Sequence, residues 1–327
     1  MPVMQYIEAV RETLRSEMRR DPNVFIMGED VGKRGGVFRA TQGLIDEFGE
    51  ERVIDTPLTE SAIVGVGIGA ALYGMRPVCE IQFADFIWPA MNQIISEAAR
   101  FRYRSYGTWF VPMVIRAPYG GGVHGGLYHS QSVEAHFAHS PGLKIVAPST
   151  PGDVAGLLRA AIRDDDPVLF FEHKGLYRAV KGEVPEGDYV IPIGKADVKR
   201  DGRDITVFSY GKALHFCLEA AQMVAAEGID AMVVDLRSLR PLDEETILNA
   251  AARTGKVLIV HEDNAFMGIG AEVAALIAEK VLFELDAPIL RLCGPEVPAM
   301  PYSPPLEKWY MLSPEKVAAK MRELAAF

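Results

Sequence analysis

The chain has 327 residues, of which 49% are hydrophobic and 24% are charged. At roughly 150 residues per domain, this length favours two domains over one. The composition is that of a globular protein with a sizeable core, and it excludes disordered, collagen-like and coiled-coil chains.

The charge balance and the cysteines limit the binding partners and the cellular compartment of the protein. Asp and Glu outnumber Lys and Arg by 44 to 34, so the net charge of −10 has the wrong sign for binding nucleic acid or an anionic membrane surface. Cys79, Cys217 and Cys293 form no CxxC pair, which argues against a disulfide framework or a zinc ribbon and favours a reducing compartment. The first residues lack a signal peptide's pattern and no run is long enough for a membrane span, so we expect a cytoplasmic protein.

In the first half, helical and strand patterns alternate. Apolar residues at helical spacing predict a helix over residues 4–20, which Asp21-Pro22 ends. Alternating strands and helices favour a mostly parallel sheet covered on both faces. The predicted strands span residues 24–28, 53–55, 77–82, 111–116, 144–147 and 167–171, and the other predicted helices span 61–73, 88–102 and 151–163.

The second half repeats this alternation after a polar stretch rich in Pro and Gly. Residues 181–203 are the predicted linker, with one weak strand at 189–193. The fold class is therefore predicted as α/β, with two doubly wound, mostly parallel-sheet domains at residues 1–180 and 204–327. Strands are predicted at 204–211, 231–236, 256–261 and 288–293, and helices up to about 227 and at 243–253, 271–285 and 314–326.

The segment after the strand at 53–55 contains two features of interest. Gly65-x-Gly67-x-x-Ala70 matches a dinucleotide fingerprint, but its glycines fall inside the predicted helix instead of at a strand-to-helix turn. Close helix packing is the favoured interpretation of these glycines. Glu60 lies in the first turn of the same helix, where an acidic residue most simply complements the helix dipole.

Four of the seven histidines lie within a glycine-rich segment and the helix after it. The separations of His124, His129, His136 and His139 fit no common zinc motif, so proton transfer or anion binding is favoured over metal binding in the loop. We expect His136 and His139 to cap or pack a helix. The basic run Arg100–Arg104 is predicted to form a surface or interface edge, and Asp164–Asp166 a solvated turn.

Several motifs in a fixed order carry a family resemblance. They are Gly28-Glu-Asp-Val-Gly, Asp55-Thr-Pro-Leu-Thr-Glu60, Glu80-Ile-Gln-Phe-Ala-Asp-Phe86, Arg102-Tyr-Arg-Ser, His129-Ser-Gln-Ser and Phe170-Phe-Glu-His-Lys-Gly-Leu-Tyr-Arg178 in the first half, and Val234-Asp-Leu-Arg-Ser-Leu-Arg-Pro-Leu-Asp243 and His261-Glu-Asp-Asn in the second. Together they resemble the β subunit of the thiamine diphosphate-dependent 2-oxo acid dehydrogenases. The resemblance implies a pyrimidine-binding transketolase-like domain at residues 1–180 and a transketolase C-terminal-like domain at 204–327.

That resemblance implies an enzyme whose site is shared with a second chain. The β subunit holds the aminopyrimidine of thiamine diphosphate, and an α subunit holds the diphosphate through Mg²⁺, with a Gly-Asp-Gly motif that this sequence lacks. The implied reaction decarboxylates a 2-oxo acid and acylates the lipoyl group of an acyltransferase core, in an α2β2 heterotetramer docked on that core. Phe327 and Glu323 are the predicted docking groups, and branched-chain 2-oxo acids are favoured over pyruvate or acetoin as substrates.

The resemblance also implies roles for individual residues. Glu60 and His129 are the predicted catalytic residues, with Glu60 on the pyrimidine nitrogen and His129 facing the substrate carboxylate and the lipoyl group. Leu58, Gln82 and Phe86 are the predicted cofactor neighbours, with Phe86 stacking on the aminopyrimidine. The predicted K⁺ ligands are Val111, Met113, Val114, Ala161, Asp164 and Asp166, although the family more usually has Asn at the last position.

Two other classes of function remain open at this point. A two-domain oxidoreductase would use Gly65-x-Gly67-x-x-Ala70 for NAD, and would show saturable NAD binding. A non-catalytic interaction subunit would tolerate replacement of Glu60 and His129, and the intact set of Glu60, Phe86 and His129 argues against it.

Overall fold

The computed structural model describes residues 1–327, which divide into two compact units. The first unit contains residues 1–119 and 136–193, and the second contains residues 120–135 and 194–327. No helix has the length and apolar character that crossing a membrane requires.

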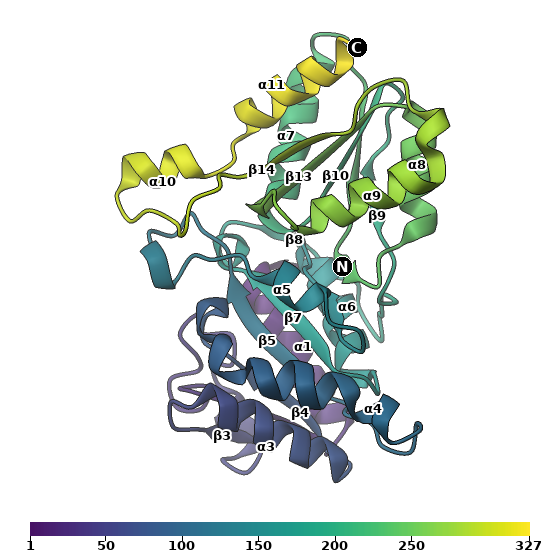
Figure 1. Cartoon of the computed structure of the whole chain (residues 1–327). Helices are drawn as coiled ribbons and strands as arrows, with labels where there is room; N and C mark the ends of the chain where they lie inside the picture. The colour runs from purple at the N-terminus through teal and green to yellow at the C-terminus, as the bar shows by residue number, and fades with distance from the viewer. The chain divides into compact units, whose positions relative to one another are not determined.

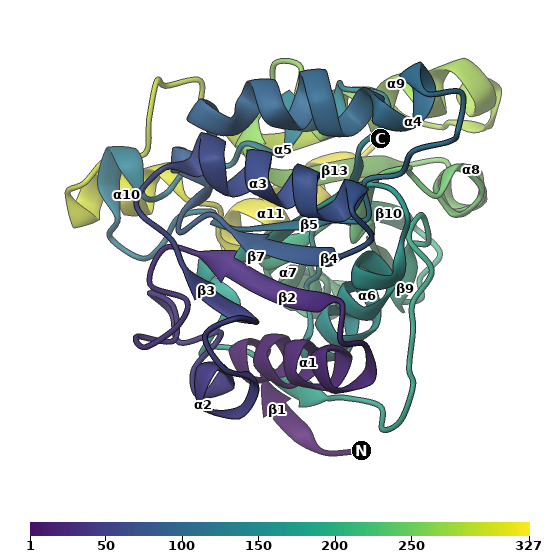
Figure 2. The ribbon, with the colours of Figure 1, turned by 90° about the horizontal axis from the view of Figure 1, so that it is seen from below.

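The first unit is built on a parallel sheet with strand order β6-β7-β5-β4-β2-β3. Every residue of β2 and β7 is buried, as expected for strands covered on both faces. Figure 2 shows α3 on one face of the sheet and α1 on the other. The strands are β2 Val24–Gly28, β3 Val53–Asp55, β4 Arg76–Glu80, β5 Val114–Tyr119, β6 Lys144–Val146 and β7 Val168–His173.

The helices of this unit follow the predicted ones closely. They are α1 Tyr6–Arg20, α2 Leu44–Phe48, α3 Glu60–Leu72, a run of helical turns from Ala84 that ends with α4 Phe101–Arg104, and α6 Pro151–Arg163. Gly67 lies inside α3, where an added Cβ would be only 2.6 Å from Cys79 Sγ on β4. Gly67 therefore serves close packing of α3, as predicted, whereas a Cβ on Gly65 would make only an ordinary contact with Gln93 at 3.8 Å.

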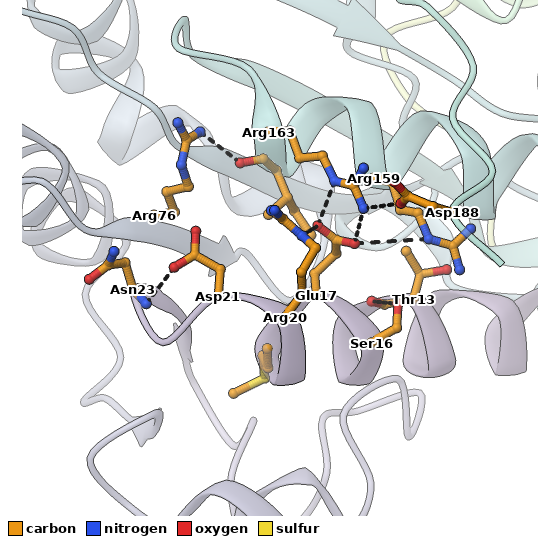
Figure 3. Close-up of polar contacts among 12 residues, drawn as sticks. Thr13, Ser16, Glu17, Arg20, Asp21, Asn23, Arg76, Arg159, Arg163 and Asp188 are labelled. Atoms are coloured by element: carbon orange, nitrogen blue, oxygen red, sulfur yellow. Dashed lines mark hydrogen bonds and ion pairs between the residues drawn. The ribbon is translucent and has the colours of Figure 1, made fainter.

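Helix α1 packs on α6 around a buried carboxylate, as Figure 3 shows. Glu17 is 1% exposed and accepts hydrogen bonds from Arg163 Nε at 2.9 Å and Arg163 Nη2 at 2.7 Å. Arg20 Nε adds a third at 3.0 Å, and Arg159 Nε lies 3.9 Å away. Because a buried carboxylate is costly unless it is paired, these contacts fix how α1 lies on α6.

A second buried network joins three neighbouring strands. Arg116 on β5 is fully buried; its Nε and Nη2 donate to Glu172 on β7 at 2.6 and 2.8 Å, and its Nη1 donates to Glu80 on β4 at 2.5 Å. Tyr177 Oη donates to Glu172 at 2.7 Å. Burial raises the pKa of Glu80 against the opposing effect of Arg116, and the two carboxylates raise the pKa of Arg116 despite its burial.

The second unit has a five-stranded sheet with strand order β14-β13-β10-β11-β9, in which only β9 is antiparallel to its neighbour. Its strands are β9 Asp197–Arg200, β10 Ile205–Ser209, β11 Ala231–Asp235, β13 Val257–Asn264 and β14 Leu290–Gly294, with the short β12 Ser238–Arg240 after β11. Figure 1 shows α7 and α11 side by side on one face of this sheet and α8 and α9 on the other. The helices are α7 Gly211–Ala225, α8 Glu244–Thr254, α9 Ile269–Val281, α10 Pro304–Tyr310 and α11 Pro314–Ala325.

The predicted α/β class with mostly parallel sheets is confirmed, while some local predictions are wrong. Residues 189–193 form no strand, because Ile191 packs its side chain on Gly156 of α6 and donates its N–H to the Gly156 carbonyl at 3.2 Å. The predicted linker instead contains β9 and β8 Lys181–Glu183, and β8 pairs antiparallel with β1 Val3–Gln5. Strand β5 begins at Val114 instead of residue 111, after Pro112, which has no N–H for a sheet bond.

The Arg116 network yields a stability prediction. We expect Arg116→Met to lower the free energy of unfolding by about 3–5 kcal/mol, because it leaves Glu80 and Glu172 buried without their cation. Urea unfolding of the full chain measures this loss. The matched control is Arg104→Met, whose half-exposed side chain pairs with Glu97 and should change stability by no more than about 1 kcal/mol. Equal stability of the two variants would contradict the role assigned to Arg116.

Candidate functional site

The winding of the first sheet indicates where this unit binds a ligand. From β2, the chain adds β3 on one side of that strand and β4 on the other. In open α/β sheets, ligands bind beyond the carboxyl ends of the strands at such a switch in direction. The segments that leave these strand ends carry Glu29, Leu58 and Glu60, and Gln82 and Phe86. The structure thus brings the four predicted cofactor residues to one edge of one sheet.

Glu60 begins α3 and is half-buried. Its carboxylate has no hydrogen-bond or ion-pair partner in the chain. It lies near Glu29, whose pKa is raised first by burial and then by the Asp30 and Glu60 carboxylates. Leu58 is 71% exposed beside it. The buried Thr56 Oγ1 also lacks a partner, so this corner offers a ligand polar groups that the fold does not use.

Gln82 and Phe86 follow β4. Gln82 Nε2 donates to the Glu29 carbonyl at 3.4 Å, which ties the segment after β4 to the segment after β2. The half-buried Phe86 ring meets Phe83 edge-on, with ring centroids 5.6 Å apart, and Phe83 meets Phe38 at 5.4 Å. Phe38 in turn lies 5.1 Å from Tyr177 of the buried network. The position of the Phe86 ring therefore depends on aromatic packing that extends into the core.

The predicted K⁺ ligands gather at the opposite, amino-terminal edge of the sheet. Val114 pairs with Val168 at the start of β5 and β7, and the Met113 carbonyl accepts the Val168 N–H at 3.0 Å. Val111 lies just before β5, and its carbonyl accepts the Met113 N–H at 2.8 Å. Ala161 is in the last turn of α6, and its carbonyl accepts the Asp164 N–H at 3.4 Å.

Cationic side chains of the protein already engage the two carboxylates of that set. Lys144 Nζ lies 2.7 Å from both oxygens of Asp164 and 3.4 Å from Asp166. Arg102 Nε binds Asp166 at 2.5 Å, and Arg76 donates to the Asp164 carbonyl at 3.0 Å. No group of three or more His, Cys, Asp or Glu residues is arranged to hold a metal ion. A K⁺ site that uses the Asp164 and Asp166 carboxylates as ligands does not fit this arrangement.

The predicted catalytic histidine belongs to the second unit. His129 is half-buried in the glycine-rich loop, and Gly120 N–H closes the loop by donating to the Gln131 carbonyl at 3.0 Å. His136 has a packing role, as predicted: its ring lies 5.0 Å from the Trp88 ring, edge-on. No described contact tests the prediction for His139.

The second unit also buries acids that the sequence analysis did not single out. Glu134 is fully buried and accepts a hydrogen bond from Tyr210 Oη at 2.8 Å, while its other oxygen has no partner. Burial and the nearby Asp263 carboxylate raise the pKa of Glu134, and burial raises the pKa of Asp263. Burial lowers the pKa of His261 to about 4, so its imidazole is neutral at pH 7. Two acids at the end of a buried apolar strand, Glu262 and Asp263 of β13, were the available signal in the sequence.

Comparison with known proteins agrees with this layout. Residues 3–180 match the family model described as the transketolase pyrimidine binding domain, and residues 194–317 match the transketolase C-terminal domain. The chain is 65% identical over 327 residues to 2-oxoisovalerate dehydrogenase subunit beta of Bacillus subtilis, covering all of both chains. The chain belongs to the transketolase-like β subunits of the 2-oxo acid dehydrogenases.

Other members of this β-subunit family differ in their substrates. The chain is 48% identical to the Bacillus subtilis pyruvate dehydrogenase E1 component subunit beta, over 94% of this chain and 95% of that one. It is 44% identical to the beta subunit of that organism's acetoin:2,6-dichlorophenolindophenol oxidoreductase, over 98% and 97%. A split gene transketolase, described as an inactive beta4 tetramer, has the same fold, with a TM-score of 0.80 and 24% identity over 99% of this chain and 98% of that one.

Glu134 of this β-subunit chain gives a pH-dependent prediction. A carboxyl group with a raised pKa in the folded state binds its proton more tightly in the folded protein than in the unfolded chain. Its contribution to stability therefore falls as the pH rises above 4.5, the ordinary pKa of a Glu side chain. Glu134→Gln removes this penalty and can still accept from Tyr210. We therefore expect the melting temperature of Glu134→Gln minus that of the unmodified chain to be larger at pH 8 than at pH 5. Melting curves across that range measure the difference, and a constant or shrinking difference would show that Glu134 does not ionise this way.

Proposed function

We propose that the chain is the β subunit of a heterotetrameric 2-oxo acid dehydrogenase that decarboxylates a 2-oxo acid on thiamine diphosphate. The reaction then reductively acylates the lipoyl group of the acyltransferase component: the electron pair left by decarboxylation cleaves the lipoyl disulfide, one sulfur takes the acyl group and the other leaves as a thiol. The observation that carries the proposal is Glu60, an unpaired carboxylate at the switch point of a pyrimidine-binding fold.

The residues at this edge suit the aminopyrimidine half of thiamine diphosphate. Thiamine diphosphate supplies an electron sink for the pair of electrons that decarboxylation leaves behind. The unpaired Glu60 carboxylate would hold a proton at a pyrimidine ring nitrogen, the half-buried Phe86 ring would stack on the ring, and Leu58 and Gln82 would line it. Together they would bind and orient the cofactor and place the Glu60 proton.

The proposal gives His129 the second catalytic role. It lies in a loop that is separate from the Glu60 edge in the sequence, and we assign it to the substrate carboxylate and the incoming lipoyl group. The two ring nitrogens of an imidazole can donate and accept hydrogen bonds, so His129 can bind an anion or pass on a proton there.

The proposed site needs ligands for Mg²⁺ and the diphosphate that a partner subunit would supply. The sequence has no Gly-Asp-Gly motif, so we propose that Mg²⁺ and the diphosphate are held by an α subunit that carries one. The acyltransferase core would bind the assembled enzyme through this chain's carboxyl-terminal unit, with Glu323 and Phe327 as contacts. Any K⁺ at the sites near β5 and α6 would be coordinated by backbone carbonyls, since Lys144 and Arg102 engage the carboxylates.

Branched-chain 2-oxo acids are the proposed substrates. The support is the 65% identity to a 2-oxoisovalerate dehydrogenase subunit, against 48% for the pyruvate relative and 44% for the acetoin relative. Turnover of 2-oxoisovalerate, pyruvate and acetoin by the assembled complex decides between them, and the highest kcat/KM is expected with 2-oxoisovalerate.

Glu60→Gln tests the proposed chemistry. The amide keeps the shape of the side chain but cannot exchange the proton, so we expect turnover of the assembled enzyme to fall by at least about 100-fold with an unchanged melting temperature. Glu50→Gln, an exposed site ten residues earlier, is the control and should keep full activity. Decarboxylation by Glu60→Gln at the normal rate would contradict the mechanism.

Reconstitution tests the shared site. We expect the purified chain alone to show no 2-oxo acid decarboxylation with thiamine diphosphate and Mg²⁺, and to gain it when the co-purifying Gly-Asp-Gly subunit is added. Activity of the chain alone would overturn the half-site proposal. Saturable NAD binding by the chain would instead favour the oxidoreductase alternative. The burial of Gly67 inside α3 argues against that alternative.

A further inference from the structure

The loop that carries His129 is held by acids that lie far from it in the sequence. Glu262, on β13, accepts the Gly121 N–H at 2.5 Å. Glu307, on α10, accepts the His124 N–H at 3.1 Å, and its other oxygen lies 2.5 Å from His124 Nδ1. Both glutamates are nearly fully buried, at 6% and 3% exposure. Two elements of the second unit thus fix the loop backbone at two points.

The loop also fits closely against the segment that leads into α10. A Cβ on Gly121 would be 2.3 Å from Met300 Cε, and one on Gly126, whose φ is +63°, would be 2.9 Å from Tyr302. His124 itself has a φ of 56°, which a residue with a side chain adopts only where surrounding contacts impose it. The contacts of Glu307 with both the backbone and the ring of His124 are such contacts.

Little apolar burial stabilises the rest of the loop. Leu127 is 50% exposed and Tyr128 is 71% exposed, so the residues just before His129 contribute few core contacts. The loop is a compact segment with joined ends, and the two glutamates and the Gly120–Gln131 hydrogen bond hold its backbone. Loss of one polar anchor should therefore loosen the loop without unfolding the unit.

We propose that Glu262 and Glu307 are positioning residues that place His129 for catalysis through the backbone of the Gly120–Gln131 loop. This inference rests on the proposed function, because it concerns the step that His129 serves. Both anchoring acids belong to the second unit, as His129 itself does. An error of about 1 Å in a reacting group can lower a rate by roughly 100-fold, so modest loosening should be measurable.

The test uses the enzyme assembled with its α subunit. We expect Glu307→Gln to reduce kcat for acyl transfer to a lipoyl domain on the order of 10-fold, with an unchanged melting temperature. Hydrogen exchange of the backbone amides in residues 120–131 should become faster, while exchange in β10 stays the same. Glu279→Gln, exposed on α9, is the matched control and should change neither quantity.

A double-variant cycle separates positioning from a merely structural role. If Glu307 acts through His129, Glu307→Gln added to His129→Asn should lower kcat by less than about 2-fold further. A full additional 10-fold loss, or unchanged loop exchange in Glu307→Gln, would overturn the inference. If Glu307→Gln does not fold, Glu262→Gln takes its place, since it removes the anchor from a different element.

Failure of the proposed function gives a different result. In that case the unmodified complex shows no 2-oxo acid decarboxylation, which overturns the catalytic role of the anchors together with that of His129. A wild-type complex that is active while both anchor variants retain normal kcat and normal loop exchange refutes the positioning role alone.

Discussion

The buried guanidinium of Arg116 is the interaction on which the first unit depends. Three adjacent strands each contribute one charged residue to this buried network: Glu80 from β4, Arg116 from β5 and Glu172 from β7. These charges lie near the carboxyl ends of the strands, where the candidate site begins. Glu80 is the last residue of β4, and Gln82 follows it by two positions. Because charges inside a protein tolerate little displacement from their partners, the network fixes the end of β4, from which the segment with Gln82 and Phe86 starts.

The same network continues into the aromatic packing behind the site. Tyr177 donates to Glu172 and also contacts Phe38, which is followed by Phe83 and then Phe86. In the proposed function Phe86 stacks on the cofactor, and a ring that is already held in one orientation loses less entropy on binding. The edge-on contact with Phe83 provides that restraint for Phe86.

Local patterns in the sequence predicted the features that depend on local physics. Alternating helical and strand periodicity predicted the parallel sheets, and the position of Gly67 relative to Pro57 correctly placed the glycines inside α3. Sequence patterns could not predict that residues 189–193 pack on α6 instead of forming a strand, because an extended apolar segment has the same appearance in both settings. The acids of the second unit were missed for a related reason: Glu134 and Asp263 are distant in the sequence, and only the fold brings their charges together.

For Glu60, the fold adds information that the local sequence pattern lacks. From the sequence alone, an acid in the first turn of a helix is most simply a partner for the helix dipole. In the structure, two of the buried acids are bound on both oxygens by an arginine: Glu17 by Arg163 and Glu172 by Arg116. Glu60 has no such partner, although it lies where open α/β sheets bind ligands. The helix dipole of α3 is one interaction of Glu60, but no side chain or backbone group of the chain binds its carboxylate, and a ligand at this edge would supply the partner that is lacking.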